Sequence, residues 1–225
     1  MRNILAFFGL ISIVLGGVLF TQFKPYLNLY GQIDSETKSF IFENIDKVTK
    51  MEPAVLKNYI DQAKALDPKA YDTYLSMADV LLKSGNTAEA TVWKFPVAED
   101  LSVEDVVETM KTVANELNFS NVGQLPLYKD IEAKMGKKHR YIEMFLFCDS
   151  LIAAKMLEYS DSFSAYFPCR ITLVEDLKGK LWLYTLNMDM MIHGGRPLPP
   201  ELLKEAQKVK TIIVEIMKRG ASGEF

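Results

Sequence analysis

The stretch that decides the fold runs from Tyr141 to Leu186 and reads YIEMFLFCDSLIAAKMLEYSDSFSAYFPCRITLVEDLKGKLWLYTL. Its opening segment, Tyr141 to Cys148, predicts a strand, and Ser150 to Tyr159 predicts a helix. Arg170 to Glu175 and Lys180 to Leu186 predict two more strands, joined by the turn DLKG, which ends in glycine. A hairpin is antiparallel, and here helices are intermixed with strands. We therefore expect an α+β fold, a small two-layer domain with an antiparallel or mixed sheet and helices on one face.

Residues upstream of this stretch extend the same domain. Ala90 to Val97 predicts an edge strand interrupted by proline. Ser102, followed three residues later by Asp105, forms a capping box that opens a helix with one apolar face. The region from Gly123 to His139 is irregular, with at most a short strand and a short helix.

The C-terminal residues predict one long helix. Pro199 and Pro200 precede an apolar stripe at helical spacing, which can pack on the sheet of its own chain or on a partner subunit. Lys218 and Arg219 suit the negative end of a helix, and we expect Gly220 to end it.

The N-terminal part differs in character from the rest. Residues 34–86 predict three helices, which begin near Asp34, Pro53 and Asp67, and Gly85 ends the third. We expect four parts in the chain: a transmembrane anchor at 1–23, a helical stalk or cap at 24–88, an α+β core domain at 89–192, and a C-terminal helix packed on the core at 193–225.

The predicted anchor is the run ILAFFGLISIVLGGVLF from Ile4 to Phe20, which has no charged residue. As a helix it would span roughly 25 Å, close to the thickness of a bilayer core, and Tyr26 and Tyr30 follow at interfacial depth. A cleaved signal peptide and a buried core helix are the alternatives, but the run lacks a small-x-small cleavage pattern. We expect a single-pass protein of a bacterial inner membrane, with the C-terminal domain in the periplasm.

Both cysteines of the chain, Cys148 and Cys169, lie in the opening stretch. If their strands are antiparallel, both thiols lie at one end of the sheet. Asp149 and Ser150 begin the helix after Cys148, so free backbone N–H groups there could lower the pKa of its thiol. Four readings stay open: two small buried residues, a disulfide, a metal, haem or sulfur-carrying site, or a catalytic thiol. Cys148, Asp149, Ser150 and Cys169 are the candidate ligand or redox site.

A second candidate lies in the segment NMDMMIHGG. If the strand continues through it, Met188 and Met190 share a face, and His193 follows. Thioether and imidazole ligands suit a soft metal such as Cu(I), particularly if Cys148 or Cys169 points the same way. Methionines that fill a core are the competing reading.

Several function classes are disfavoured by the sequence. The net charge is −3, without the concentrated basic face that nucleic acids require. The sequence contains no CxxC, HExxH, glycine-rich phosphate loop or G-x-S-x-G motif, so we expect no ordinary hydrolase or transferase and identify no catalytic residue or cofactor.

From about Thr91 to Met191 the chain resembles the bacterial family catalogued as domain of unknown function 302. The resemblance rests on a strand ending in Cys148, a short helix, the triplet Phe167-Pro168-Cys169, an acidic turn with glycine, and a closing strand. Asp149-Ser150 departs from the family's frequent Asn-Pro, and Asn187 to Met191 departs from its Asp-Pro. Membership implies a small two-layer α+β fold that self-associates and has no established activity.

Together these features favour a membrane-anchored periplasmic domain that binds a ligand or a protein partner without catalysis. A thiol-based redox, soft-metal, haem or sulfur-handling accessory that uses Cys148 and Cys169 is the alternative. A structural subunit of a membrane complex is a third hypothesis, and a homodimer is a further expectation.

Overall fold

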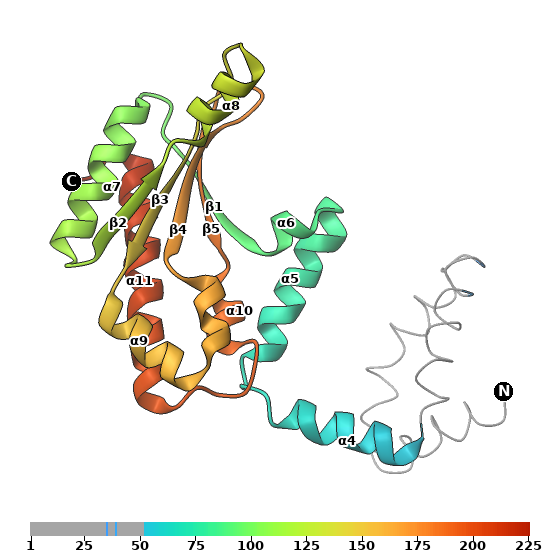
Figure 1. Cartoon of the computed structure of the whole chain (residues 1–225). Helices are drawn as coiled ribbons and strands as arrows, with labels where there is room; N and C mark the ends of the chain where they lie inside the picture. The colour runs from blue at the N-terminus through green and yellow to red at the C-terminus, as the bar shows by residue number, and fades with distance from the viewer. Residues whose placement is uncertain (1–34, 36–38, 40–51) are drawn as a thin grey trace. The chain divides into compact units, whose positions relative to one another are not determined.

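A computed structural model describes Ser35, Ser39 and residues 52–225 (Figure 1). The predicted anchor and nearly all of the helix predicted from Asp34 lie outside these residues. Within the described part of the chain, no helix combines the length and apolar character needed to cross a membrane. The chain divides into two compact units, Met1–Lys64 and Ala65–Phe225. In the first unit, helix α4 (Pro53–Lys64) carries an exposed ion pair, 3.6 Å long, between Lys57 and Asp61.

The second unit is built on a five-stranded sheet with the order β1-β5-β4-β3-β2, in which every neighbouring pair is antiparallel. The α+β class is confirmed, and of the two sheet types that the sequence left open, antiparallel and mixed, the sheet is antiparallel. The strands are β1 (Val92–Pro96), β2 (Ser120–Leu125), β3 (Ile142–Cys148), β4 (Cys169–Glu175) and β5 (Leu181–Leu186).

The predicted hairpin is the turn between β4 and β5. The carboxylate of Asp176 accepts hydrogen bonds from the backbone N–H groups of Lys178 and Lys180, at 2.8 and 2.9 Å. Gly179 has a φ of +82°, a conformation that glycine adopts without steric cost. The residues of the turn and the alternation of the two flanking strands therefore both favour a hairpin here.

Along the chain, the helices of the unit come before, between and after the strands (Figure 1). Ser102 and Asp105 form the predicted capping box at the start of α7. The helices are α5 (Ala70–Ser84), α6 (Thr87–Ala90), α7 (Val103–Glu116), α8 (Leu127–Met135), α9 (Ser150–Tyr159), the 3₁₀ helix η1 (Asp161–Tyr166), α10 (Met188–His193) and α11 (Pro200–Ser222).

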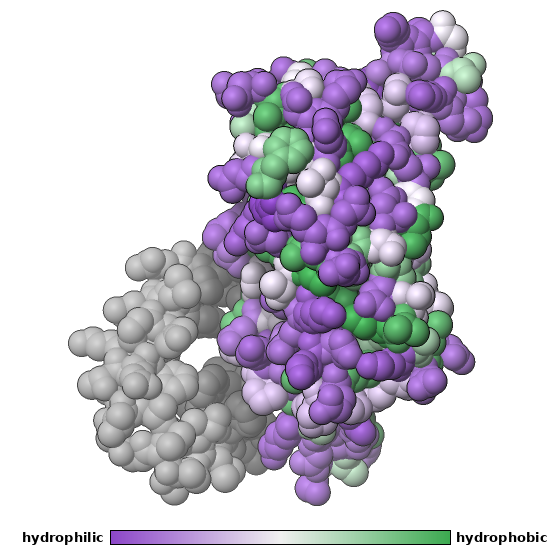
Figure 2. Space-filling model, turned by 90° about the vertical axis from the view of Figure 1, so that its left-hand side faces the viewer, coloured by the Kyte–Doolittle hydropathy of each residue, from purple (hydrophilic) through white to green (hydrophobic). Residues whose placement is uncertain are grey.

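The hydrophobic core lies between one face of the sheet and helices α7 and α11. Alternate residues of the three central strands are fully buried on that face: Phe145, Phe147, Ile171, Leu173 and Leu183. The side of the molecule on which α7 lies in Figure 1 is largely hydrophilic outside, with apolar residues showing between polar ones (Figure 2). This matches an amphipathic helix that turns its apolar face inward.

Gly220 does not end the last helix, contrary to the sequence prediction. α11 continues to Ser222, and Gly223 takes the left-handed position with a φ of +75°. A Cβ on Gly220 would lie 2.5 Å from Cγ of Met110, so this glycine allows α11 and α7 to approach closely. Gly223 carries out the capping role that the sequence suggested for Gly220.

Candidate functional site

The two cysteines lie at the same end of the sheet, but on opposite faces. In the antiparallel ladder of β3 and β4, Phe147 is directly opposite Cys169. Cys169 therefore shares the buried core face of Phe147, whereas Cys148 points to the other face. Both cysteines are free. The strand ends meet as the sequence suggested, yet the alternation of side chains directs the thiols apart.

The pKa of Cys148 is raised, so the expected activation of its thiol by the helix start is wrong. Burial is the main cause, and the adjacent carboxylate of Asp149 adds to it. Asp149 caps α9 by accepting hydrogen bonds from the N–H groups of Leu151 and Ile152, at 3.0 and 3.1 Å. The helix N–H groups are thus engaged by a carboxylate, and Ser150 is an exposed first residue of the helix.

Cys169 is held still more strongly as a thiol. Burial, assisted by the proximity of Cys148, raises its pKa to about 12. Because the thiolate is the nucleophile and the metal ligand, neither cysteine has the electrostatic setting of a reactive site.

The segment considered for a soft metal is helical, which corrects the expectation of a continuing strand. Asn187 caps α10 by accepting a hydrogen bond from the N–H of Asp189 at 3.0 Å. On a helix, Met188 and Met190 are two residues apart and face different directions. Met188 is in the hydrophobic core, and among the described residues no three His, Cys, Asp or Glu side chains group as metal ligands.

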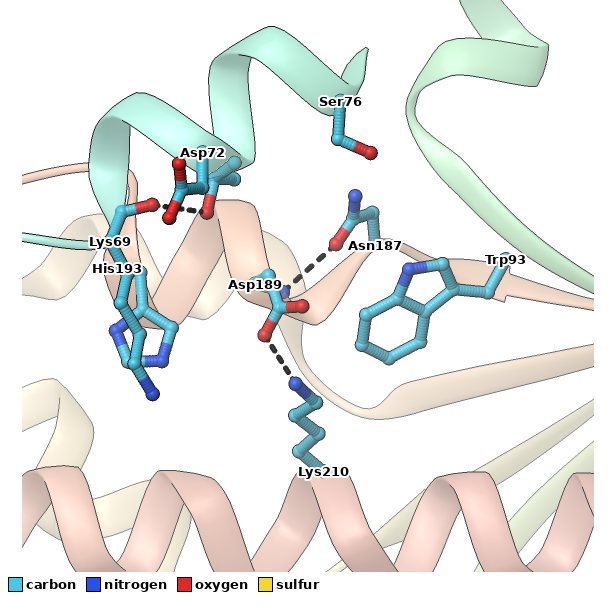
Figure 3. A pocket seen from close by; sticks show the side chains of 9 residues that line it. Lys69, Asp72, Ser76, Trp93, Asn187, Asp189, His193 and Lys210 are labelled. Atoms are coloured by element: carbon cyan, nitrogen blue, oxygen red, sulfur yellow. Dashed lines mark hydrogen bonds and ion pairs between the residues drawn. The ribbon is translucent and has the colours of Figure 1, made fainter. Parts of the chain in front are cut away.

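A different site lies between α5 and the end of the sheet, and we call it the α5 cleft (Figure 3). Its volume is about 320 Å³. The α5 side provides polar groups that repeat along one face of the helix, and β1 provides an indole. The N-cap of α10, α10 itself and α11 provide the remaining walls. The lining residues are Lys69, Asp72, Thr73, Ser76, Trp93, Asn187, Asp189, His193 and Lys210.

The start of α5 is fixed against α10 by local and long-range hydrogen bonds. The carboxylate of Asp67 accepts the backbone N–H of Lys69 at 2.8 Å, and the backbone N–H of Asp67 donates to Gly195 O at 2.8 Å. The hydroxyl of Tyr74 donates to Gly194 O at 2.7 Å. These contacts hold the polar face of α5 over residues that follow more than a hundred positions later.

Asp67 and His193 form a buried pair beneath the cleft. Nδ1 of His193 lies 3.2 Å from Oδ2 of Asp67, and both side chains are 7% exposed. Among the described residues this Nδ1 has no hydrogen-bond partner, so the two side chains lie close together without a hydrogen bond between them. Burial alone would raise the pKa of Asp67, but the Lys69 N–H and His193 together lower it.

A second charged pair lies on the opposite wall of the cleft. Nζ of Lys210 lies 2.5 Å from Oδ1 of Asp189 and 5.3 Å from the centroid of the Trp93 ring. Lys210 therefore links a carboxylate of α10 to the indole of β1 by an ion pair and a cation–π contact. About a third of each charged side chain of this pair is exposed, so the pair borders the open part of the cleft.

Two charged residues of the cleft have no ion-pair partner within the described part of the chain. Lys69, the residue just before α5, and Asp72, in the first turn of α5, are exposed and line the cleft. Asn187 uses its side-chain oxygen for the α10 cap, which leaves its NH₂ group for a ligand. In Figure 3 this NH₂ group is turned toward the side on which Ser76 lies. The cleft can therefore offer one cation, one anion and amide donors to a small molecule.

Of the residues singled out in the sequence, His193 alone belongs to this cleft, and neither cysteine does. The segment NMDMMIHGG, interpreted from sequence as a metal candidate, provides Asn187, Asp189 and His193, and the helix predicted from Asp67 provides the α5 side of the cleft. Their meeting depends on a contact between distant parts of the chain. The spacing of residues within either segment gives no indication of that contact.

Comparisons with known proteins give a family. No curated protein matches the chain. The crystal structure of an uncharacterized conserved protein DUF302 from Bacillus stearothermophilus is 14% identical, with a TM-score of 0.48, over 57% of this chain and 97% of its own. The family described as Domain of unknown function DUF302 matches residues 93–220, more than half of the sequence. The chain therefore belongs to the DUF302 family.

Proposed function

We propose that the unit Ala65–Phe225 is a non-catalytic binding module that takes a small polar ligand in the α5 cleft. One observation supports this most strongly. The polar face of α5, which precedes the region matched by the family, lies over Asn187, Asp189 and Trp93 of the family domain and makes a cleft with unpaired polar groups. A volume of about 320 Å³ lies at the small end of the range for ligand sites.

The electrostatics of the cleft favour binding over catalysis. Asp189 is engaged with Lys210, and the lowered pKa of Asp67 keeps that buried carboxylate ionised at neutral pH. A general acid or base needs a pKa near the working pH, and the lowered pKa of Asp67 does not provide one. They act in this proposal as fixed walls that orient a ligand.

The thiol alternative has less support from the geometry. Cys148 and Cys169 belong to opposite faces of the sheet, and burial raises the pKa of each thiol. The α5 cleft has a larger set of convergent polar groups, so we place the ligand there.

We retain from the sequence the proposal that Ile4 to Phe20 anchors this module in a bacterial inner membrane, with the module in the periplasm. Its support is the uncharged run itself. In spheroplasts, added protease should degrade the C-terminal unit. Protection of that unit until the membrane is lysed would place it on the cytoplasmic side.

Binding in the cleft can be followed by tryptophan fluorescence. The chain has two tryptophans. Trp93 lines the cleft, whereas Trp182 neighbours the buried Leu183 in β5 and so points to the other face of the sheet. In the full chain with Trp182→Phe, we expect at least one compound of a polar-metabolite panel to change Trp93 fluorescence saturably and to raise the unfolding midpoint.

A matched pair of substitutions on α5 assigns this response to the cleft. Ser76→Phe fills the cleft from an exposed position, whereas Ala78→Phe adds the same bulk at an exposed residue outside the lining. The response should disappear in the first variant and persist in the second. If no compound gives a response that Ser76→Phe removes, the binding proposal is wrong.

A further inference from the structure

We propose that the ligand of the α5 cleft is a neutral sugar of a single ring. Its hydroxyl groups bind between Ser76, Asn187 and Asp189, and its ring packs on the indole that β1 provides. This inference rests on the proposed binding function and names the chemical class of the ligand. It begins from the hydrogen-bonding groups of the cleft that have no partner among the described residues.

Two donors of the cleft have no acceptor within the part of the chain that the structure describes. The side-chain oxygen of Asn187 accepts the N–H of Asp189, which leaves the NH₂ group of Asn187 for a ligand. The indole N–H of Trp93 has no acceptor either. In Figure 3 the indole nitrogen lies on the edge of the ring that is turned toward Asn187. Both donors therefore border the same part of the cleft.

Acceptors lie beside these donors. Oδ1 of Asp189 is paired with Lys210 at 2.5 Å, and Figure 3 shows the other carboxylate oxygen turned toward the side of Trp93. The exposed hydroxyl of Ser76, which both donates and accepts, lies on the side to which the NH₂ group of Asn187 is turned. A ligand hydroxyl has one O–H and two lone pairs, so adjacent hydroxyls can satisfy donors and acceptors that lie close together.

The charges in this part of the cleft favour a neutral ligand. Asp189 and Lys210 match each other, so a charged ligand would meet a like charge on one member of the pair. Lys69 and Asp72 are exposed, and in Figure 3 their charged ends lie on the opposite side of Asp189 from the indole. Water reaches these two side chains at the rim, and the ligand does not have to neutralise them.

The half-buried indole of Trp93 provides the apolar part of the site. The faces of a sugar ring carry C–H groups, which pack on a flat aromatic surface while the hydroxyls at the ring edge reach polar side chains. The cleft of about 320 Å³ has room for roughly ten waters at about 30 Å³ each. That size suits one sugar ring.

Other ligand classes fit these groups less well. A carboxylate would face the second oxygen of Asp189, and an amine would face the N–H donors and the ammonium group of Lys210. An apolar compound would cover the donors of Asn187 and Trp93 without giving them an acceptor, which costs binding free energy. Like charges and unpaired donors thus penalise the wrong ligand.

The test uses the full chain and isothermal titration calorimetry, so that Trp93 can itself be substituted. D-glucose, D-galactose, D-mannose and D-ribose are titrated first. The sugar that binds best is then compared with its uronic acid and its amino sugar, which keep the ring and add one charge of either sign. We expect saturable binding of at least one neutral sugar, and binding of both charged analogues about tenfold weaker or worse.

Matched substitutions connect the binding to the two donors. Asn187→Ser keeps an oxygen for the α10 cap and removes the NH₂ group, and it should weaken the sugar about tenfold. Its control is Asn86→Ser, because Asn86 caps α6 by accepting the N–H of Ala88 at 2.9 Å and lies outside the lining. Trp93→Phe removes the indole N–H and part of the flat surface, and it should also cost about tenfold, whereas Trp182→Phe should not.

The outcomes separate this inference from the binding proposal beneath it. The sugar assignment is wrong if a charged analogue binds more tightly than the neutral sugar, or if Asn187→Ser and Trp93→Phe leave sugar binding unchanged. It is also wrong if none of the four sugars binds while another compound of the polar-metabolite panel gives a response that Ser76→Phe removes. In that case the cleft is still a ligand site. If no compound at all gives such a response, the binding function itself fails.

Discussion

At the scale of single residues, Asp67 connects the start of α5 with the end of α10. Its folded pKa is lowered, so its charge stabilises the fold at pH values above the ordinary aspartate pKa, near 4. This stabilisation is lost as the pH falls through the lowered folded value. Asn at this position keeps an oxygen for the Lys69 N–H but loses the charge beside His193. We expect Asp67→Asn to lower the free energy of unfolding by about 1 kcal/mol at neutral pH.

The pH dependence of this difference is the diagnostic measurement. Urea unfolding of both proteins from pH 7 to pH 3 should give a constant difference above roughly pH 5, which shrinks below about pH 4 as the wild-type carboxylate takes up a proton. Asp79→Asn, on the exposed part of α5, is the control. A difference that grows on acidification would contradict the lowered pKa of Asp67.

The thiols provide a second prediction at this scale. With a pKa of about 12, only roughly one Cys169 in ten thousand is a thiolate at pH 8. In the Cys148→Ala variant, a disulfide reagent at pH 8 should leave the native protein unmodified and react fully in concentrated urea. Cys169→Ala isolates the less buried Cys148, which should react in the native state, though more slowly than a free thiol. Rapid modification of native Cys169 would overturn the burial argument and restore the redox hypothesis.

These residues also mark what the sequence could predict. The pattern located Cys148 correctly between a strand and a helix, because strand and helix periodicities are local properties. It misjudged the direction of the pKa change, since that depends on Asp149 occupying the helix N–H groups and on burial by residues elsewhere. Local sequence gives the position of a side chain far better than its electrostatic surroundings.

At the scale of elements, the close approach of α7 and α11 depends on Gly220. Gly220→Ala places a Cβ 2.5 Å from Cγ of the fully buried Met110, and the strain should exceed the gain in helix propensity of about 1 kcal/mol. We expect a net loss of about 1–2 kcal/mol in thermal or urea unfolding. Gly195→Ala, at a position with no atom within 4 Å of the added Cβ, should be close to neutral.

A double substitution tests the cause of that loss. Met110→Ala alone should cost about 2–5 kcal/mol because it opens a cavity. In that background, Gly220→Ala should be harmless or stabilising, because the space it needs is now open. Additive losses would show that Gly220 affects stability by some route other than contact with Met110.

The elements that the sequence indicated only weakly or missed share a physical cause. β2 has glycine and asparagine and a bulge between Asn121 and Gly123, so its alternation is weak, and pairing with β3 determines it. The segment after β5 forms α10 because Asn187 caps it and Met188 enters the core. The capping box of α7 and the hairpin of β4 and β5, by contrast, are encoded in a few adjacent residues and were predicted correctly.

At the scale of the whole molecule, the hydrophobic core and the α5 cleft have different origins in the chain. The buried cluster runs from Val97 to Ala221 and includes no residue of α5. Within α5 only Ala70 and Thr73 are buried, and few polar contacts join it to α10. The cleft could not be predicted from the sequence because one of its walls is positioned by these few long-range contacts.

This difference predicts that the core folds without α5, whereas ligand binding in the cleft requires α5. A fragment of residues 91–225 keeps every residue of the buried cluster and should unfold cooperatively in urea, followed by far-ultraviolet circular dichroism. A fragment of residues 65–225 should be more stable by about 1–3 kcal/mol, because it adds the hydrogen bonds of Asp67 and Tyr74 and the burial of Ala70. With Trp182→Phe in both, only the longer fragment should show the fluorescence response of Trp93 to a cleft ligand. If the shorter fragment lacks a cooperative transition, α5 belongs to the folding core. If the shorter fragment responds to the ligand as the longer one does, the α5 face contributes nothing to the site.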